Sequence, residues 1–513
     1  MANESRVKKT LLNARVNLIF YFLTLALSFF SRKIFLNTLG DNFVGLTSTL
    51  TNLLSFLNLA ELGIGLAIGY VLYKPLFEQN KTQINEIISV FGYLYNWVGK
   101  FILVVGVILS IFLPIIFPNT GFNLAVIFLA YYSFLTSSLI GYFINYRQTL
   151  LAADQKNYVV TAYFQTGNII KTLIQMISAY YTQSYFLWIG IELSFGIIYS
   201  FILNWKINQV YPWLKSDVKT GKHLYKKYPE VMKYTKQLFI HKIAGLIQFQ
   251  STPFLIYSFV SLQTVAFYGN YTIITDKLKL LFENFLGSTA AGIGNLIAEG
   301  NKQKILTVYW EMMALRYFIV ATIAFSLYFT LPLFINLWLG PEYLLSNRTL
   351  ILVLIIFSLN ILRGTTDQFI NGYGLFYDIW APAAESIIFI IIAITGGHLW
   401  KLEGILLGSI ISLLVIVYGW KPYFLFKKGF NLPVKNYWYG ILKLSLISGT
   451  SLVLFTYLNS YIELNIVKTN WLGFVLFALY TGSLFAIIQF SLLYIGSSGM
   501  KSLVQRFLNT LNI

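Results

Sequence analysis

Several ionisable side chains lie inside apolar stretches of this sequence, and these residues are the most able to do chemistry. Asp276, Lys279 and Glu283 are spaced i, i+3 and i+7, which places them on one face of a helix, whereas Lys277 lies on another face. A charge in a membrane interior is costly, so such residues are candidates for binding ionic ligands or carrying protons. A structural alternative stays open, in which the three form a self-neutralising ladder against a neighbouring helix.

Other cations lie in apolar stretches elsewhere in the chain. Arg32 and Lys33 are near the end of the first stretch, and Lys242 is near the start of another, so their long side chains could extend to lipid headgroups. Arg316 is close to the middle of its stretch, where that explanation is weaker. Lys and Arg form charge-assisted hydrogen bonds with phosphate oxygens, so these cations are candidate anion ligands.

Other types of site are not indicated by the sequence. There is no cysteine, which excludes disulfides and thiolate nucleophiles, and His223, His241 and His398 are too far apart to form a metal-ligand motif. We therefore expect no metal site and no catalytic residues. Arg363 and Asp367 are four residues apart, which favours a structural ion pair, while Lys100 and Lys171 lie deep in two further stretches.

The elements that position these side chains are membrane-spanning helices. Hydrophobic residues make up 57% of the 513 positions and charged residues only 11%, against about 25% charged residues in soluble domains. Apolar runs of roughly 20 residues, the length that crosses a bilayer, recur throughout the chain. We predict an all-α polytopic membrane protein with about fourteen transmembrane helices. The expected helices are 14–39, 44–73, 85–117, 122–147, 158–181, 184–206, 237–260, 264–298, 305–338, 347–371, 377–397, 402–424, 437–459 and 470–496.

Basic residues in the connections predict the orientation. With the N-terminus in the cytoplasm, most Lys and Arg between the helices fall on the cytoplasmic side, and this positive-inside asymmetry places both termini there. Membrane topology and anionic lipids thus account for the net charge of +18, so no nucleic-acid partner is expected. Segment 207–236 is the longest polar connection, and its interleaved Lys, Trp and Tyr predict an interfacial segment on the cytoplasmic headgroups.

A weak internal repeat suggests how the helices are grouped. The segment EQNKTQI at 78–84 matches EGNKQKI at 299–305, which aligns the second expected helix with the eighth. A duplicated six-helix unit produces this correspondence. The expected organisation is an N-lobe over 1–206, a basic cytoplasmic linker over 207–236 and a C-lobe over 237–430, followed by two more helices and a cytoplasmic tail over 431–513.

Three segments of the chain look like those of a known family. The most specific is 31–81, with Arg32 to Gly40, Gly45–Leu46 and LAELGIG at 59–65. The others are SLQTVAFYGNYTII at 261–274 and NGYGLFYDIWAPAAES at 371–386. On these segments the chain resembles bacterial polysaccharide-transporter proteins, the oligosaccharide flippases of the multidrug/oligosaccharidyl-lipid/polysaccharide exporter superfamily (Wzx-type proteins).

The resemblance implies two six-helix bundles around a central cavity that opens to each side in turn. The implied cargo is an undecaprenyl-diphosphate-linked oligosaccharide, a unit of O-antigen, capsule or exopolysaccharide. A cationic lining of Arg32, Lys33, Lys242, Lys277, Lys279 and Arg316 would then bind the diphosphate, with no cofactor beyond H⁺ or Na⁺ as a coupling ion. The candidate coupling carboxylates are Glu61, Asp276 and Glu283. The candidate sugar contacts are Asn52, Asn58, Gln248, Gln250, Asn270 and Tyr271.

This resemblance places the protein in the bacterial cytoplasmic membrane as a transporter rather than an enzyme. Its expected partners are membrane lipids, the lipid-linked oligosaccharide and polysaccharide polymerases or glycosyltransferases. Two alternatives stay open: a small-molecule exporter of the multidrug branch and a polytopic glycosyl-transfer enzyme. An ATP-driven pump is disfavoured, because GSSGMKS at 496–502 lacks the spacing of a phosphate-binding loop.

Overall fold

The computed structural model describes residues 6–57, 64–118, 120–154, 156–232, 250–287, 289–375, 377–378, 380–461 and 470–510. Helices dominate these ranges, and no strand occurs within them. The chain divides into two compact units, Met1–Ala266 and Phe267–Ile513. The division lies later than the predicted start of the C-lobe at 237, so the linker and the helical residues 250–259 belong to the N-terminal unit.

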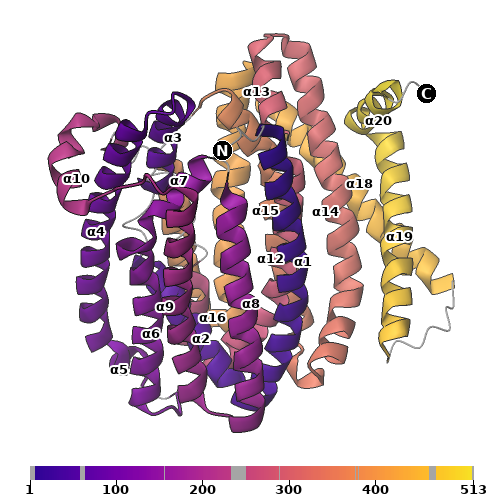
Figure 1. Cartoon of the computed structure of the whole chain (residues 1–513). Coiled ribbons are helices and arrows are strands. Elements are labelled where there is room, and N and C mark those ends of the chain that lie inside the picture. The colour runs from indigo at the N-terminus through magenta and orange to yellow at the C-terminus, as the bar shows by residue number, and fades with distance from the viewer. Residues whose placement is uncertain are drawn as a thin grey trace. The chain divides into compact units, whose positions relative to one another are not determined.

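The N-terminal unit is a bundle of long helices with short connecting helices (Figure 1). Its core consists of leucine, isoleucine, phenylalanine and tyrosine side chains buried between these helices. The described helices are α1 (Arg6–Leu39), α2 (Asp41–Ser55), α3 (Ile64–Phe77), α4 (Lys81–Ile111), α5 (Leu113–Ile116), α6 (Leu124–Phe143), α7 (Gln148–Ala153), α8 (Asn157–Thr182), α9 (Tyr185–Val210) and α10 (Val218–Leu224).

The C-terminal unit has a second core of buried aliphatic and aromatic side chains. Its first helix, α12, begins in the N-terminal unit and crosses the boundary between the units. The described helices are α12 (Leu262–Gly287), α13 (Ala290–Ala298), α14 (Lys302–Trp338), α15 (Asn347–Gly372), α16 (Trp380–Ser412), α17 (Lys421–Leu425), α18 (Lys435–Tyr461), α19 (Trp471–Gly496) and α20 (Ser498–Thr510).

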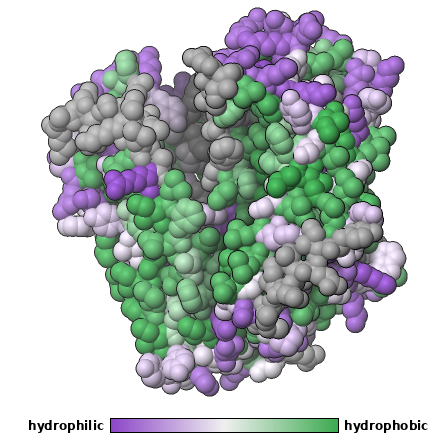
Figure 2. Space-filling model, turned by 90° about the vertical axis from the view of Figure 1, so that its right-hand side faces the viewer, coloured by the Kyte–Doolittle hydropathy of each residue, from purple (hydrophilic) through white to green (hydrophobic). Residues whose placement is uncertain are grey.

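The helices have the lengths and surfaces of membrane spans. Within the described ranges, nine helical segments are long and apolar enough to cross a bilayer. In Figure 2, apolar side chains cover the middle of the surface that is drawn, and hydrophilic side chains gather at its ends. The prediction of an all-α polytopic membrane protein is confirmed.

One of these segments, Trp380–Phe430, contains two of the expected spans. The chain reverses at Trp400 and Lys401, whose backbone is not helical, and Lys401 has a φ of 51°. The helical segments before and after this reversal pack closely, since a Cβ atom added to Gly404 would lie 1.9 Å from the carbonyl oxygen of Gly396. This tight reversal agrees with the predicted break between 377–397 and 402–424.

The repeated sequence segments form the same local structure. Asn80 caps α4 by accepting a hydrogen bond from the amide of Gln83, and Asn301 caps α14 by accepting one from Lys304. The residue before each cap, Gln79 or Gly300, has a positive φ. An Asn cap satisfies an amide that the helix itself leaves unpaired. The two matching segments therefore form the same kind of turn, and each turn precedes a long helix of its own unit.

The basic linker packs on the end of α4, as α10 does in Figure 1. A Cβ atom added to Gly221 would lie 2.0 Å from the carbonyl oxygen of Ser89, so α10 approaches the α4 backbone closely. Asp217 caps α10, and its hydrogen bonds with Thr220 hold the pKa of its carboxyl below the usual value. The described part of the linker, 207–232, is thus folded onto the bundle, in addition to any contact with headgroups that its sequence predicts.

Candidate functional site

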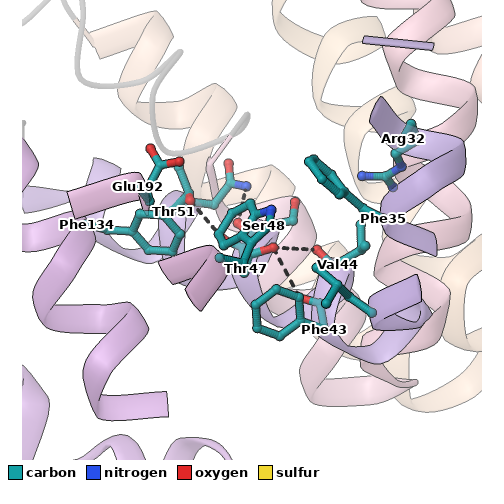
Figure 3. Close-up of a pocket in the computed structure, with 12 residues that line it drawn as sticks. Arg32, Phe35, Phe43, Val44, Thr47, Ser48, Thr51, Phe134 and Glu192 are labelled. Atoms are coloured by element: carbon teal, nitrogen blue, oxygen red, sulfur yellow. Dashed lines mark hydrogen bonds between the residues drawn. The ribbon is translucent and has the colours of Figure 1, made fainter. Parts of the chain in front are cut away.

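The N-terminal unit contains a cavity of about 360 Å³, which we call the Arg32 cavity. Figure 3 shows Arg32 and Glu192 on opposite sides of it, with Thr47 and Ser48 between them. Its full lining is Arg32, Phe35, Leu39, Phe43, Val44, Thr47, Ser48, Thr51, Asn52, Phe134, Trp188 and Glu192. Hydroxyl, amide and aromatic groups next to a guanidinium suit a ligand that combines sugar rings with an anionic group.

The local helical structure presents these groups to the cavity. Arg32 is near the end of α1, and its Nη2 donates a 2.7 Å hydrogen bond to the carbonyl oxygen of Ala266. The hydroxyl of Thr47 and the amide of Asn52 each donate to backbone carbonyls one turn earlier in α2. These hydrogen bonds hold the three side chains in place. The side-chain oxygens of Thr47 and Asn52 can still accept hydrogen bonds from a ligand.

An ion pair between α8 and α9 lies beside this cavity. Lys171 Nζ is 2.7 Å from Glu192 Oε1, and Gln175 Nε2 donates a 3.0 Å hydrogen bond to Glu192 Oε2. Both carboxylate oxygens therefore have a protein partner. Only 16% and 18% of the Lys171 and Glu192 side chains are exposed. Pairing of this kind makes the two charges tolerable inside a membrane protein.

The C-terminal unit contains its own cluster of charges. Asp367 on α15 accepts a 2.9 Å hydrogen bond from Arg363 Nε and a 2.7 Å hydrogen bond from Lys421 Nζ. Arg363 also has Nη1 3.7 Å from Glu385 Oε1 on α16. The predicted pair between Arg363 and Asp367 is confirmed. It belongs to a larger network that joins α15, α16 and α17.

Arg316 lies within the interior of the same unit. It is 3% exposed, and its Nη1 donates a 2.9 Å hydrogen bond to the carbonyl oxygen of Ile361. The guanidinium fits against Gly364, where an added Cβ would lie 2.6 Å from Nη1. The Arg316 guanidinium therefore connects α14 to α15, and its role in binding the cargo stays a prediction.

The predicted charged face of α12 contains an ion pair. Lys279 Nζ is 3.8 Å from Glu283 Oε1, as the i, i+4 spacing allows. Asp276 is exposed, and Lys277 and Lys279 are half-buried. The ladder is therefore present between Lys279 and Glu283, and its role in binding stays a prediction.

The other predicted site residues have different surroundings. Asn52 lines the Arg32 cavity, whereas Lys33 is exposed and does not line it. Asn270 is buried, and Tyr271 is 1% exposed with its hydroxyl accepting a hydrogen bond from the amide of Leu345. Gln250 is half-buried in the helical residues 250–259. The remaining predicted residues, Asn58, Glu61, Lys242 and Gln248, lie outside the described residues.

Sequence reasoning did not identify Glu192, Glu385 or Lys421 as intramembrane partners of other charges. Glu192 is the only acidic residue between Tyr185 and Val210, and Lys171 lies on the preceding helix, but the sequence does not say that the two face each other. Among the described residues, no group of three His, Asp or Glu side chains is placed to hold a metal ion.

No protein-family model matches this chain, and no curated protein matches it significantly. Three solved structures share its fold at low sequence identity. The lipid II flippase MurJ in an inward closed conformation has a TM-score of 0.63 and 17% identity, covering 93% of this chain and 98% of MurJ. An inward-facing multidrug resistance MATE family transporter of the MOP superfamily has a TM-score of 0.58 and 13% identity, covering 85% and 99%.

The third structure is the Vibrio cholerae MATE transporter VcmN, in a mutant form, with a TM-score of 0.50 and 12% identity over 83% of this chain and 99% of that one. The similarity extends over nearly the whole length of each of these three proteins. The chain therefore has the polytopic fold shared by MurJ and the MATE transporters.

Proposed function

We propose that this protein is a flippase that moves an undecaprenyl-diphosphate-linked oligosaccharide across the bacterial cytoplasmic membrane by alternating access. The observation that carries the proposal is the Arg32 cavity, in which a guanidinium lies across from Glu192 with the hydroxyls of Thr47 and Ser48 between them, and the amide of Asn52 belongs to the same lining. The guanidinium would bind a phosphate oxygen of the cargo, and the hydroxyl, amide and aromatic side chains would contact its first sugar.

The shared fold supports a transporter over a polytopic glycosyl-transfer enzyme, since the three similar structures are named as a flippase and two transporters. In this proposal the cargo is a repeat unit of O-antigen, capsule or exopolysaccharide. Polymerases or glycosyltransferases of the same pathway would be partners, and a gradient of H⁺ or Na⁺ would drive the cycle.

The test is transport by the purified protein in liposomes. A labelled undecaprenyl-diphosphate oligosaccharide is placed in the outer leaflet, and its protection from an added glycosidase is followed with time. We expect the Arg32→Ala variant to lower the rate at least tenfold, because it removes the guanidinium from the cavity. The matched control is Arg15→Ala, which removes an exposed arginine from the same helix and should stay within twofold of the parent.

Failure of the parent protein with several glycans and with both ion gradients, despite a folded and monodisperse sample, would contradict the proposal. An equal loss in both variants would show that Arg32 has no particular role in binding.

A small-molecule exporter is the second candidate, and the specific observation that favours it is the carboxylate of Glu192 in the cavity wall. Such a carboxylate could attract a cationic drug, although its ion pair with Lys171 weakens that attraction. Uptake of a fluorescent organic cation into the same liposomes, lost in Glu192→Gln and retained in Arg32→Ala, would favour the exporter.

A further inference from the structure

The N-terminal unit contains a second cavity of about 290 Å³, which we call the Lys171 cavity. Side chains of α6, α7, α8 and α9 line it, together with Asn145 in the turn between α6 and α7. Glu192 is the one described residue that lines both this cavity and the Arg32 cavity. The two cavities are therefore adjacent at the Glu192 side chain, and the proposed function so far assigns no occupant to the second.

The charges in the wall of the Lys171 cavity neutralise each other. Lys171 and Glu192 are the two charged residues of its lining, and their 2.7 Å ion pair leaves no net charge. Gln175 donates a further hydrogen bond to Glu192, so both carboxylate oxygens have a protein partner. An ionic ligand would have to break this pair and leave one charge uncompensated, which is costly in such surroundings. The cavity therefore suits a ligand that is polar but neutral.

Two amide side chains in the wall are available to such a ligand. Asn168 on α8 and Gln148 on α7 are half-buried, and within the described part of the chain neither side chain makes a hydrogen bond. Asn145, in contrast, accepts a 2.8 Å hydrogen bond from Ser200 inside the bundle. An amide offers both donors and an acceptor, so each of the two available side chains can bind a pair of neighbouring hydroxyl groups.

The rest of the wall provides flat apolar faces and open space. Phe164 and Tyr199 pack edge to face with ring centroids 5.1 Å apart, and Phe195 belongs to the same lining. A Cβ atom added to Gly141 would meet nothing within 4 Å, so the cavity is open beside α6. Aromatic faces with a few directed polar groups are typical of small-molecule sites. A pyranose ring fits them, because it presents C–H groups on its faces and hydroxyls at its edge.

We propose that the Lys171 cavity is a sugar subsite that binds a neutral pyranose of the cargo glycan beyond its first sugar. This assignment rests on the proposed function, in which the Arg32 cavity holds a phosphate and the first sugar. A later sugar of the same glycan would lie past Glu192, with its hydroxyls bonded to Asn168 and Gln148. The subsite would thereby select cargo by the length of its glycan.

The test uses single cysteines, which the natural sequence allows because it contains no cysteine. Gly141→Cys places a thiol in the Lys171 cavity without a clash. Gly190→Cys is the matched control, with equal space for the side chain at a position that lines neither cavity. Each purified protein reacts with a small uncharged maleimide in the presence of undecaprenyl diphosphate. This lipid carries either one N-acetylhexosamine or that sugar extended by two neutral hexoses.

We expect the trisaccharide lipid to slow the labelling of Gly141→Cys at least fivefold and the monosaccharide lipid to leave it within twofold. Labelling of Gly190→Cys should respond to neither lipid. Asn168→Leu, added to Gly141→Cys, removes the amide at similar volume and should abolish the protection. Asn157→Leu removes an exposed amide at the start of the same helix and should retain it.

Equal protection by the two lipids would overturn the proposal, as would no protection by the trisaccharide with or without its lipid. Protection by inorganic diphosphate alone would also overturn it, because the ion pair would then open for an anion. A Gly141→Cys thiol that never reacts would show that the cavity is closed, with the same consequence.

The trisaccharide free of lipid, at millimolar concentration, separates this site from the flippase itself. Selective protection by the free trisaccharide in a protein that moves no cargo would support the subsite and contradict the flippase. Transport of cargo without selective protection would support the flippase and contradict the subsite.

Discussion

At the scale of single residues, several buried or half-buried charges in the described chain have a partner of opposite sign. Lys171 pairs with Glu192 in the N-terminal unit, and Asp367 lies between Arg363 and Lys421 in the C-terminal unit. An isolated charge in such surroundings would be strongly unfavourable, whereas a hydrogen-bonded pair is tolerated. Loss of one member should therefore be more damaging than loss of an exposed ion pair.

Asp367→Asn provides the first test, because it leaves Arg363 and Lys421 without the carboxylate that they share. We expect a loss of about 3–5 kcal/mol in the free energy of unfolding, seen as a lower melting temperature by tryptophan fluorescence in detergent. Glu299→Gln removes an exposed ion pair with Lys304 in the same unit, and it should cost less than about 1 kcal/mol. Equal melting temperatures for the two variants would contradict a stabilising role of the cluster.

At the scale of elements, the basic linker is held to α4 by several contacts of different kinds. The amide of Lys215 donates to Asn85 Oδ1 at 2.7 Å, and that of Asp217 donates to Ser89 Oγ at 3.0 Å. Glu86 accepts hydrogen bonds from Lys227 and Tyr228. The linker should therefore resist proteases despite its many exposed lysines.

Gly221→Ala should release this linker. The added methyl group would meet the carbonyl oxygen of Ser89 at 2.0 Å, and such a clash costs about 1–3 kcal/mol unless α10 moves away. We expect trypsin to cut between 215 and 228 several times faster than in the parent. Gly190→Ala is the control, since its methyl group would meet nothing within 4 Å. Unchanged cleavage in Gly221→Ala would show that this close approach does not hold the linker in place.

At the scale of the whole molecule, the distribution of basic residues predicts which surfaces face the cytoplasm. Lys219→Cys lies in the linker and Arg348→Cys at the start of α15, and both positions are exposed. An impermeant maleimide should label Arg348→Cys in intact cells, but Lys219→Cys only after the membrane is permeabilised. Labelling in the reverse order would contradict the predicted topology.

The sequence by itself determined the fold class and most helix positions within the described ranges. An apolar run of sufficient length has few alternatives to a spanning helix, since a bilayer requires every backbone hydrogen bond to be made within the segment. The expected helix 158–181, for example, agrees closely with α8, Asn157–Thr182. The described helices α2 and α3 correspond to the second expected helix, and α12 and α13 to the eighth.

Only the tertiary structure decided which charged residues meet. Local spacing was enough to predict Arg363 with Asp367, because they lie one turn apart on one helix. It could not predict Lys421 with Asp367 or Lys171 with Glu192, because these pairs join different helices and depend on how each helix is rotated about its axis. The rotation of each helix about its axis also decides that Tyr271 is buried and Lys33 exposed. It directs Arg32 and Glu192, from two different helices, to one cavity. Packing between helices, which a list of apolar runs does not contain, fixes those rotations.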